Sequence, residues 1–336
     1  MMYKIVTTHR VFPETLAMLG KVGEVRSPTA ERFTKAELAA HLATARAAMI
    51  FMPDRVDSEF LDLAPEISVI SAALKGYDNV DVEACTSRGI WVNIVPDHLT
   101  APTAELAIGL LIGLARHIRA ADLHVRSGEF CGWTPRFYGH SIENSTVGVV
   151  GMGAVGLAVA KRLAGFDCRI LYCDEKPILP TNVSQGAERR PLEVLLAESD
   201  IVILCLPLHE GSFHLIDAER LALMRPHALL INPARGSLVN EAAVGDALAQ
   251  GRLGGYAADT FELEDLSRSD RPRAILPILL AHSNTLFGAH IGSATLAARR
   301  AIEARAAENI IDALAGCRPR DAINQLRLDY GSTHAS

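Results

Sequence analysis

Three polar residues in the second half of the chain have side chains that can do chemistry. Arg235, Glu264 and His290 each come after a short apolar run of strand length. An arginine offers a planar fork of donors that grips an oxyanion in two places. A histidine can move a proton near neutral pH, and a carboxylate behind it fixes the ring and favours its charged form. Together the three residues predict an anion clamp beside an oriented acid/base.

Each of these residues, taken singly, also has an ordinary structural interpretation. An arginine after a strand is often a surface charge, Glu264 lies in an acidic cluster, and His290 is one of twelve histidines. The chemical interpretation is favoured because all three would follow strands of a nucleotide-binding sheet, whose ligands bind at the carboxyl ends of the strands.

A glycine-rich turn predicts that nucleotide site. The apolar run 147–150 ends in Gly151-Met152-Gly153-Ala154-Val155-Gly156, and a helical pattern follows through Phe166. Gly151 permits the tight turn, Gly153 lets the backbone approach a pyrophosphate, and Gly156 lets helix and strand pack closely. The helix N-terminus then faces the phosphates. Glycines alone are a weak signal, but a strand before them and a helix after them favour a dinucleotide.

Asp174 ends the next apolar run and stands eighteen residues after Gly156. An acid at about this distance accepts hydrogen bonds from the ribose of a bound dinucleotide. A carboxylate repels a 2′-phosphate, so the sequence favours NAD over NADP, although Lys176 can partly offset the charge.

The elements that must position these residues alternate between strand and helix. The chain has 336 residues with 49% apolar content, enough for two cores of ordinary domain size. The first part lacks a glycine fingerprint, and a single long helix is predicted over 103–125. Alternating strands and helices predict parallel sheets with helices on both faces. The expected strands are 4–8, 47–51, 67–73, 90–95, 147–150, 169–173, 200–206, 228–231 and 255–258, and a second long helix is expected over 294–315.

Composition argues against several classes of partner. The net charge is −6 and no basic run appears, so a nucleic-acid partner is not expected. The six cysteines form no Cys-x-x-Cys pair, so no metal site is expected. The most apolar window, 106–115, is too short to span a bilayer. We expect a cytoplasmic protein without a membrane partner.

An irregular segment over 127–145 is rich in aromatic residues. It holds Trp133, Phe137 and Tyr138, although only 5% of the chain is aromatic. Exposed aromatic side chains on such a segment are expected to pack against another surface. A neighbouring subunit and the mouth of the active site are the two candidates.

Several separated motifs resemble one family. The glycine turn, Asn-Pro-Ala-Arg-Gly-Ser from Asn232, Glu-x-Glu after Asp259, His-Ile-Gly-Ser-Ala-Thr from His290 and Lys-Gly-Tyr-Asp-Asn-Val-Asp from Lys75 resemble the D-isomer-specific 2-hydroxyacid dehydrogenases. The resemblance covers nearly the whole chain. It implies an α/β fold of two doubly wound parallel-sheet domains, with a Rossmann NAD domain inserted into a flavodoxin-like substrate domain.

The resemblance also implies domain bounds and a homodimer. Residues 1–98 and 294–326 would form the substrate-binding domain, and 99–293 the NAD-binding domain with an interdomain helix and a dimer arm. The last residues, 327–336, would be a disordered tail. Arg235, Glu264 and His290 would be the catalytic set, and Asp259 would hold the nicotinamide carboxamide.

Further positions are implied for the cofactor and the substrate. NAD would contact Thr103, Gly151, Gly153, Ala154, Val155, Gly156, Asp174, Pro207, Ala234, Asp259 and His290. The substrate would contact Met52, Lys75, Gly76, Arg235 and Arg299.

Lys75 departs from the general family pattern, which has a small or aliphatic residue in that loop. A lysine beside Arg235 gives more positive charge than a monocarboxylate needs, and it suits a compact dianion. Together with segments from Met52, Arg126, Trp133 and Phe137, and with Arg299, it resembles the members that oxidise phosphite, the phosphonate dehydrogenases. We therefore expect NAD-dependent oxidation of phosphite to phosphate. The alternatives are a glyoxylate or hydroxypyruvate reductase and, from another class, an NAD-sensing corepressor-like scaffold.

Overall fold

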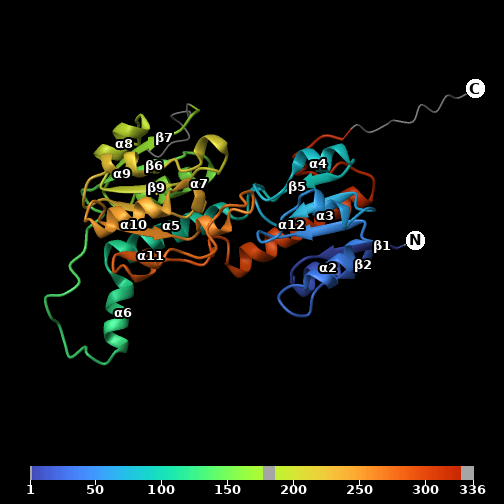
Figure 1. Ribbon diagram of the computed structural model, residues 1–336, viewed down its shortest axis with the longest axis horizontal. Coiled ribbons are helices and arrows are strands. Elements are labelled where there is room, and N and C mark those ends of the chain that lie inside the picture. The colour runs from blue at the N-terminus through green and yellow to red at the C-terminus, as the bar shows by residue number, and fades with distance from the viewer. Residues whose placement is uncertain (1, 177–185, 327–336) are drawn as a thin grey trace, which may run out of the picture. The chain divides into compact units, whose positions relative to one another are not determined.

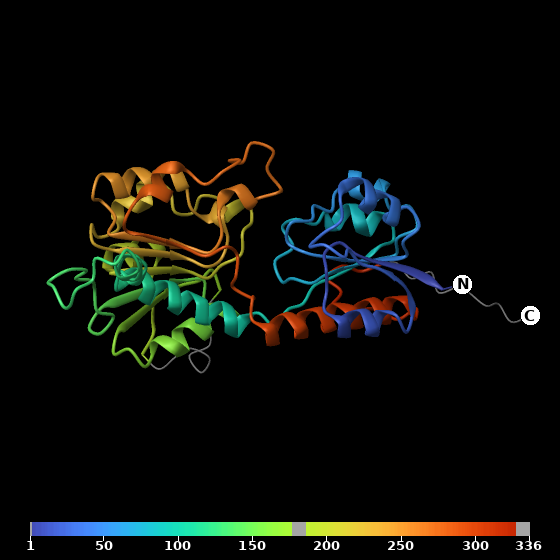
Figure 2. The ribbon, with the colours of Figure 1, turned by 90° about the horizontal axis from the view of Figure 1, so that it is seen from below.

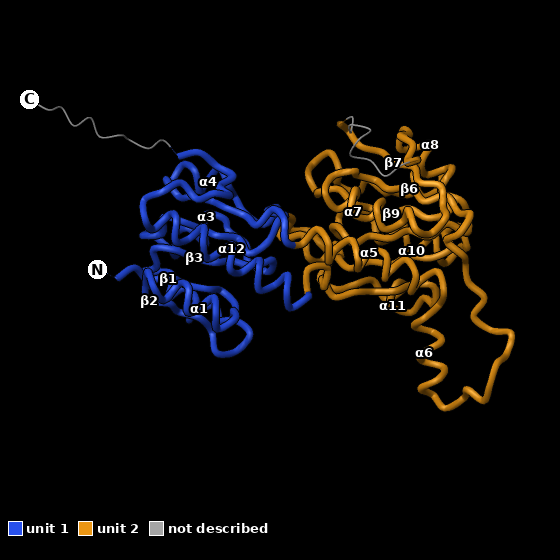
Figure 3. The backbone as a smooth tube through the Cα atoms, turned by 180° about the vertical axis from the view of Figure 1, so that it is seen from behind, with its two compact units in different colours: residues 1–98, 295–336 blue, residues 99–294 orange. Residues whose placement is uncertain are grey.

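The computed structural model describes residues 2–176 and 186–326, and the chain forms two compact units. Unit 1 comprises residues 1–98 and 295–336, and unit 2 comprises 99–294 (Figure 3). The predicted tail at 327–336 lies outside the described residues. Each unit is built on a parallel sheet with helices, so the predicted α/β class with a Rossmann domain is confirmed.

Unit 1 contains five parallel strands in the order β2-β1-β3-β4-β5, the order of flavodoxin-like sheets. The strands are β1 Tyr3–Thr7, β2 Gly23–Arg26, β3 Ala47–Ile50, β4 Val69–Ala72 and β5 Trp91–Asn93. The helices are α1 Pro13–Leu19, α2 Lys35–Leu42, α3 Ser58–Asp62, α4 Val82–Ser87 and α12 Leu296–Leu314. Every residue of β3 and β4 is buried, because helices cover both faces of a parallel sheet.

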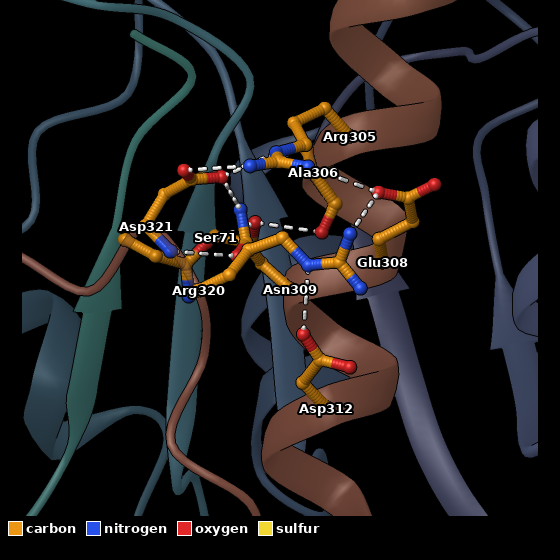
Figure 4. Close-up of polar contacts among 9 residues, drawn as sticks. Ser71, Arg305, Ala306, Glu308, Asn309, Asp312, Arg320 and Asp321 are labelled. Atoms are coloured by element: carbon orange, nitrogen blue, oxygen red, sulfur yellow. Dashed lines mark hydrogen bonds and ion pairs between the residues drawn. The ribbon is translucent and has the colours of Figure 1, made fainter.

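The edge of this sheet at β5 is closed by the chain that follows α12. Asn93 and Ala322 form an antiparallel bridge, and Ile323 donates its backbone N–H to Val92 O at 2.9 Å. Asp321 accepts two bonds from Arg305, at 2.6 and 3.0 Å, and one from Asn309 at 2.9 Å (Figure 4). The segment therefore covers backbone groups that an open edge would expose.

Unit 2 contains seven parallel strands in the order β12-β11-β10-β9-β6-β7-β8, which is the Rossmann order with one extra edge strand. They are β6 Thr146–Val150, β7 Arg169–Cys173, β8 Glu188–Arg189, β9 Ile201–Leu204, β10 Leu229–Asn232, β11 Gly255–Ala258 and β12 Thr285–Phe287. The α-helices are α5 Thr100–Ala115, α6 Ile118–Arg126, α7 Ala154–Leu163, α8 Leu192–Glu198, α9 Ala218–Leu223, α10 Glu241–Ala249 and α11 Pro277–Ala281. The short 3-10 turns are η2 Glu210–Ser212, η3 Gly236–Leu238 and η4 Glu262–Glu264. Helices lie on both faces of this sheet (Figure 2).

The prediction of a single helix over 103–125 is wrong. Two helices, α5 and α6, are separated at His117, whose φ of 51° lies in the left-handed region. A non-glycine residue there interrupts the helix, and neither glycine nor proline marks the position. Helix α6 has no buried residue, and it extends away from the rest of unit 2 with the segment that follows (Figure 1). In the described ranges no helix has the length and apolar character needed to cross a membrane.

Candidate active site

The carboxyl ends of the strands in unit 2 carry the predicted nucleotide and acid/base residues. Gly151 follows β6 and Asp174 follows β7, while Arg235, Asp259 and His290 follow β10, β11 and β12. The five strands belong to one parallel sheet, so their carboxyl ends share one edge. The point between β6 and β9, where the strand order reverses, is where such sheets bind ligands.

The glycine turn fits a dinucleotide on steric grounds. Gly151 has a φ of 89°, and a Cβ there would lie 2.7 Å from Cys205 O. A Cβ on Gly156 would lie 2.0 Å from Gly151 O, so α7 can approach the turn only with glycine at this position. A Cβ on Gly153 would meet nothing within 4 Å, which leaves space in front of the turn for a pyrophosphate. Ala154 and Val155 open α7 directly after it.

Asp174 is tied to this turn. Its Oδ2 accepts the backbone N–H of Met152 at 2.7 Å, and its Oδ1 accepts that of Lys176 at 2.9 Å. The side chain is therefore held at the end of β7 beside the glycines. Pro207, another predicted cofactor contact, follows β9, and its carbonyl accepts a bond from Ser212 Oγ at 2.9 Å.

His290 and Glu264 form the predicted pair. His290 Nδ1 lies 2.5 Å from Glu264 Oε2, and Glu264 Oε1 accepts the backbone N–H of Phe261 at 2.8 Å. His290 has a φ of 56°, and its backbone N–H donates to Asp259 O at 2.8 Å. With Nδ1 occupied by the carboxylate, Nε2 is the ring nitrogen left for proton transfer.

Asp259 holds the loop on which His290 lies. Its two carboxylate oxygens accept the backbone N–H groups of Ile291 and Gly292, at 2.9 and 2.8 Å. Burial raises the pKa of Asp259, and these two bonds oppose the rise. A Cβ on Gly292 would lie 3.3 Å from both Asp259 Oδ2 and Thr103 Oγ1, so Thr103 approaches the same loop.

The loop of Arg235 packs directly on the turn that carries Glu264. A Cβ on Gly236 would lie 1.8 Å from the carbonyl carbon of Phe261 and 2.2 Å from Glu262 N, so glycine is required there. Asn232 Nδ2 donates to Arg235 O at 2.8 Å, and Arg235 Nη1 donates to Ala234 O at 3.0 Å. Unit 2 thus brings the loops of all three predicted catalytic residues together.

Unit 1 carries the predicted substrate residues other than Arg235, at the carboxyl edge of its own sheet. Met52 follows β3, and Lys75 and Gly76 follow β4, the strand paired with it. Arg299, on α12, donates from Nη1 to Ala73 O at 3.4 Å, and its guanidinium lies 5.5 Å from the Phe51 ring. Two cations therefore lie at the loop after β4: Lys75 belongs to the loop, and Arg299 contacts it from α12.

The two cations differ in their surroundings. Burial lowers the pKa of Arg299, and Glu303, 3.9 Å from its Nη2, opposes the shift. Lys75 is partly exposed and, across 2–176 and 186–326, makes no ion pair and no side-chain hydrogen bond. Its charge is thus not neutralised by a described acidic side chain.

Comparison with known proteins identifies the family. Residues 108–292 match the NAD-binding domain of the D-isomer-specific 2-hydroxyacid dehydrogenases. The chain belongs to this family. It is 37% identical over 328 residues to a glyoxylate reductase of Pyrococcus furiosus, covering 96% of this chain and 95% of the relative. It is 36% identical over 322 residues to a glyoxylate reductase of Thermofilum pendens, with coverage of 94% and 93%.

Solved structures have the same fold. The TT0316 protein of Thermus thermophilus aligns with a TM-score of 0.87 at 33% identity, covering 96% of this chain and 100% of that one. A Sinorhizobium meliloti glyoxylate/hydroxypyruvate reductase, solved with NADP and malonate, aligns with a TM-score of 0.83 at 27% identity, covering 96% and 97%. Unit 2 of this dehydrogenase is its NAD-binding domain. The relatives' names favour the expected alternative, a glyoxylate reductase, over phosphite oxidation.

Two supporting residues of this dehydrogenase were missed by sequence reasoning. Asn79 Nδ2 donates to Asp54 O at 2.6 Å and so ties the loop after β4 to the loop of Met52. Glu303 accepts the backbone N–H of Phe12 at 2.9 Å and lies beside Arg299. The four-residue spacing of Arg299 and Glu303 on a helix was a usable signal. Among the described residues, no group of three or more His, Cys, Asp or Glu side chains is arranged to hold a metal ion.

Proposed function

We propose that this dehydrogenase oxidises phosphite to phosphate and transfers the hydride to NAD. The observation that carries the proposal is a pair of cations at one loop of unit 1: Lys75 lies on the loop after β4, and Arg299 of α12 donates to Ala73 O of that loop. A compact dianion uses both charges, whereas a monocarboxylate needs one. The resemblance of the segments around Met52, Lys75 and Trp133 to phosphite-oxidising members supports the same substrate.

The proposed reaction is HPO3²⁻ + H2O + NAD⁺ → HPO4²⁻ + NADH + H⁺. The P–H bond breaks with its electron pair, the oxygen of water forms a new P–O bond, and water gives up one proton. Bound NAD supplies the acceptor for the hydride. The protein itself must hold the anion and take the proton of water.

The first requirement is to hold the anion. Lys75 presents a compact ammonium with three donors, and Arg235 and Arg299 present planar forks that match paired oxygens. Holding the three oxygens fixes the direction of the P–H bond, because the hydrogen is the fourth substituent on phosphorus. Met52 and the backbone of Gly76 are the proposed uncharged contacts.

The second requirement is to take the proton of water. His290 is the proposed base, with Glu264 at 2.5 Å fixing the ring through Nδ1 and leaving Nε2 for the proton. As His290 gains positive charge, the carboxylate of Glu264 stabilises it. Arg235 can share the task by polarising the water.

A second candidate is the reduction of glyoxylate or hydroxypyruvate. The names of the Pyrococcus furiosus and Thermofilum pendens relatives favour it. Here Arg235 would bind the carboxylate, and His290 would donate the proton to the carbonyl oxygen. The same acid/base pair serves both reactions in opposite directions.

One assay separates the candidates. The protein is mixed with NAD and either phosphite or D-glycerate, and with NADH and glyoxylate, while NADH absorbance is followed. Rapid phosphite-dependent formation of NADH, with slower turnover of the organic acids, supports the proposal. Efficient glyoxylate reduction without phosphite oxidation contradicts it and supports the second candidate. No turnover with any of these acids favours a corepressor-like scaffold.

A further inference from the structure

A buried carboxyl lies behind the turn that carries Glu264, and the proposed reaction gives it no task. Glu241, the first residue of α10, is only 1% exposed. Its backbone N–H donates to Glu262 Oε1 at 2.8 Å, and its Oε1 accepts the backbone N–H of Glu262 at 2.9 Å. A reciprocal bridge therefore joins the start of α10 to η4. The Glu262 carboxylate also satisfies a backbone N–H that a helix start leaves without an intrahelical partner.

This bridge links the loops of the proposed acid/base and the proposed anion clamp. At one end, η4 runs from Glu262 to Glu264, which contacts His290. At the other end, α10 follows η3, whose first residue comes directly after Arg235. A shift of Glu241 would move both loops. Misplacement of catalytic groups by about 1 Å can cost about a hundredfold in rate.

The surroundings of Glu241 make its charge state matter. Burial raises the pKa of Glu241 to about 7, with the negative charges of Glu262 and Glu264 adding to the rise and the bond from the Glu262 backbone opposing it. Tyr256 on β11 also faces Glu241, and its pKa is raised by burial and then by Glu241. His214 Nε2 lies 3.0 Å from Glu262 Oε1, the same oxygen that accepts the backbone N–H of Glu241. Oε2 of Glu241 is buried and has no hydrogen-bond partner among the described residues.

We propose that Glu241 is a positioning residue for the Glu264–His290 pair. As a neutral acid it holds η4 in place, and once ionised it adds a negative charge behind the pair. The inference rests on the proposed roles of His290 and Glu264, and it does not depend on which substrate is used.

The added charge has a definite direction of effect. A negative charge behind Glu264 favours the positively charged form of the histidine that this carboxylate contacts. A permanently neutral side chain at position 241 removes the effect. In the plot of kcat/KM against pH, the limb due to the His290–Glu264 pair should then move to lower pH. The direction is the same whether the reaction uses the pair as a base or as an acid.

Glu241→Gln is the matched test, because its amide oxygen can still accept the Glu262 N–H. We expect the acid/base limb of kcat/KM to move to lower pH by about half a unit or more, because interacting sites shift each other's titration. The plateau kcat should stay within about threefold of wild type, as expected when geometry is kept. Comparing two forms of the protein cancels the titration of the substrate. Glu219→Gln, an exposed acid in the first turn of α9, is the control and should leave the profile unchanged.

Glu241→Ala removes the bridge as well as the charge. We expect kcat to fall about tenfold or more, with the KM for NAD changed less than about threefold, since the loss lies in positioning. Rescue of kcat by glutamine but not by alanine separates positioning from a general loss of folding. If the alanine variant does not fold, the glutamine variant decides on its own.

Infrared spectroscopy tests the charge state without substrate. The difference spectrum between wild type and Glu241→Gln should contain the carbonyl band of a protonated carboxyl at pH 6, and the band should fade through about pH 7. An unshifted limb together with no such band would overturn the inference. Should wild type fail to oxidise phosphite but reduce glyoxylate, the same profile is measured with glyoxylate. Should it turn over neither, the infrared band alone decides.

Discussion

Lys75, on the loop after β4, and Arg299, which contacts that loop from α12, are held in different ways. Arg299 donates to Ala73 O and lies beside Glu303, so its positive charge is partly neutralised within unit 1. Lys75 forms no ion pair with an acidic side chain among the described residues, so its full positive charge is left to interact with a ligand. We therefore expect the identity of the substrate to depend most on Lys75.

Replacement of Lys75 by alanine tests this directly. We expect the KM for phosphite to rise about tenfold or more, since a hydrogen bond to a charged group contributes about 1.5–3 kcal/mol. The KM for NAD should change little, and Lys35→Ala, on α2 of the same unit, is the control. Steady-state kinetics with each substrate varied in turn gives both constants. A KM for phosphite within a factor of two of wild type would show that the lysine is not a ligand.

We expect Asp174 to govern the choice between NAD and NADP. Asp174→Asn keeps an acceptor for the Met152 N–H but removes the charge that repels a 2′-phosphate. We expect the ratio of kcat/KM for NAD over NADP to fall about tenfold, the equivalent of about 1.4 kcal/mol. Glu175→Gln, the next acid along the chain, is the comparison variant. An unchanged ratio in the asparagine variant would mean that Asp174 does not face the ribose.

Sequence reasoning located the residues whose type is dictated by the backbone within a few positions of them. The glycine turn needs Gly151 at positive φ and Gly156 against a carbonyl, and both needs are visible in a short motif. Glu241 gave no such signal, because its importance comes from a bridge to Glu262, twenty-one residues away. Contacts of this kind depend on how β10 and β11 lie side by side, which no local pattern encodes.

At the scale of elements, the strands were easier to predict than the helix boundaries. Buried parallel strands are continuous apolar runs, so β3, β9 and β10 were visible directly. The break between α5 and α6 was not visible, because His117 adopts a left-handed conformation without glycine or proline. Burial of one face of α5 against the core of unit 2 can offset the roughly 1–2 kcal/mol that such a residue costs.

The segment after α12 stabilises unit 1 through Asp321. Burial raises the pKa of Asp321, but the bonds from Arg305 and Asn309 outweigh burial and leave the pKa lowered (Figure 4). A lowered folded pKa gives stability that is present above the unfolded value of about 3.9 and is lost as pH falls through the folded value.

Asp321→Asn should therefore lower the free energy of unfolding by about 2 kcal/mol at pH 7, as expected for lost bonds to a charged group. The difference from wild type should shrink as the pH falls below about 4, because the carboxylate of the unfolded chain then protonates before the native one. Urea unfolding at a series of pH values measures both effects. Asp312→Asn, which removes a single exposed bond from Arg320, is the control and should cost less than about 1 kcal/mol. Equal losses in the two variants would contradict a special role for Asp321.

At the scale of the whole molecule, one exposed surface is not explained by the core of either unit: the aromatic arm, which consists of α6 and the segment 127–145. Helix α6 exposes Ile118, Leu123 and Val125, each more than half accessible, and the segment after it exposes Trp133 at 83% and Tyr138 at 75%. Exposed apolar side chains gathered on one projecting segment mark an interaction surface. A second copy of the chain would cover this arm with the equivalent arm, since two-fold symmetric interfaces use the same patch on both subunits.

We therefore expect the protein to sediment as a homodimer of twice 36.2 kDa at micromolar concentration. Replacing Trp133 and Tyr138 together with serine should raise the dimer dissociation constant by about a hundredfold or more, because buried aromatic side chains dominate the energy of such interfaces. Leu223→Ser, which removes an exposed apolar side chain on α9, is the control and should leave the mass unchanged. Sedimentation over a dilution series gives the dimer dissociation constant for each form.

If wild type were a monomer at every concentration, the arm would have to cover something other than a second copy. The mouth of the active site would then be the remaining candidate, and the double variant should lower kcat/KM in the monomer.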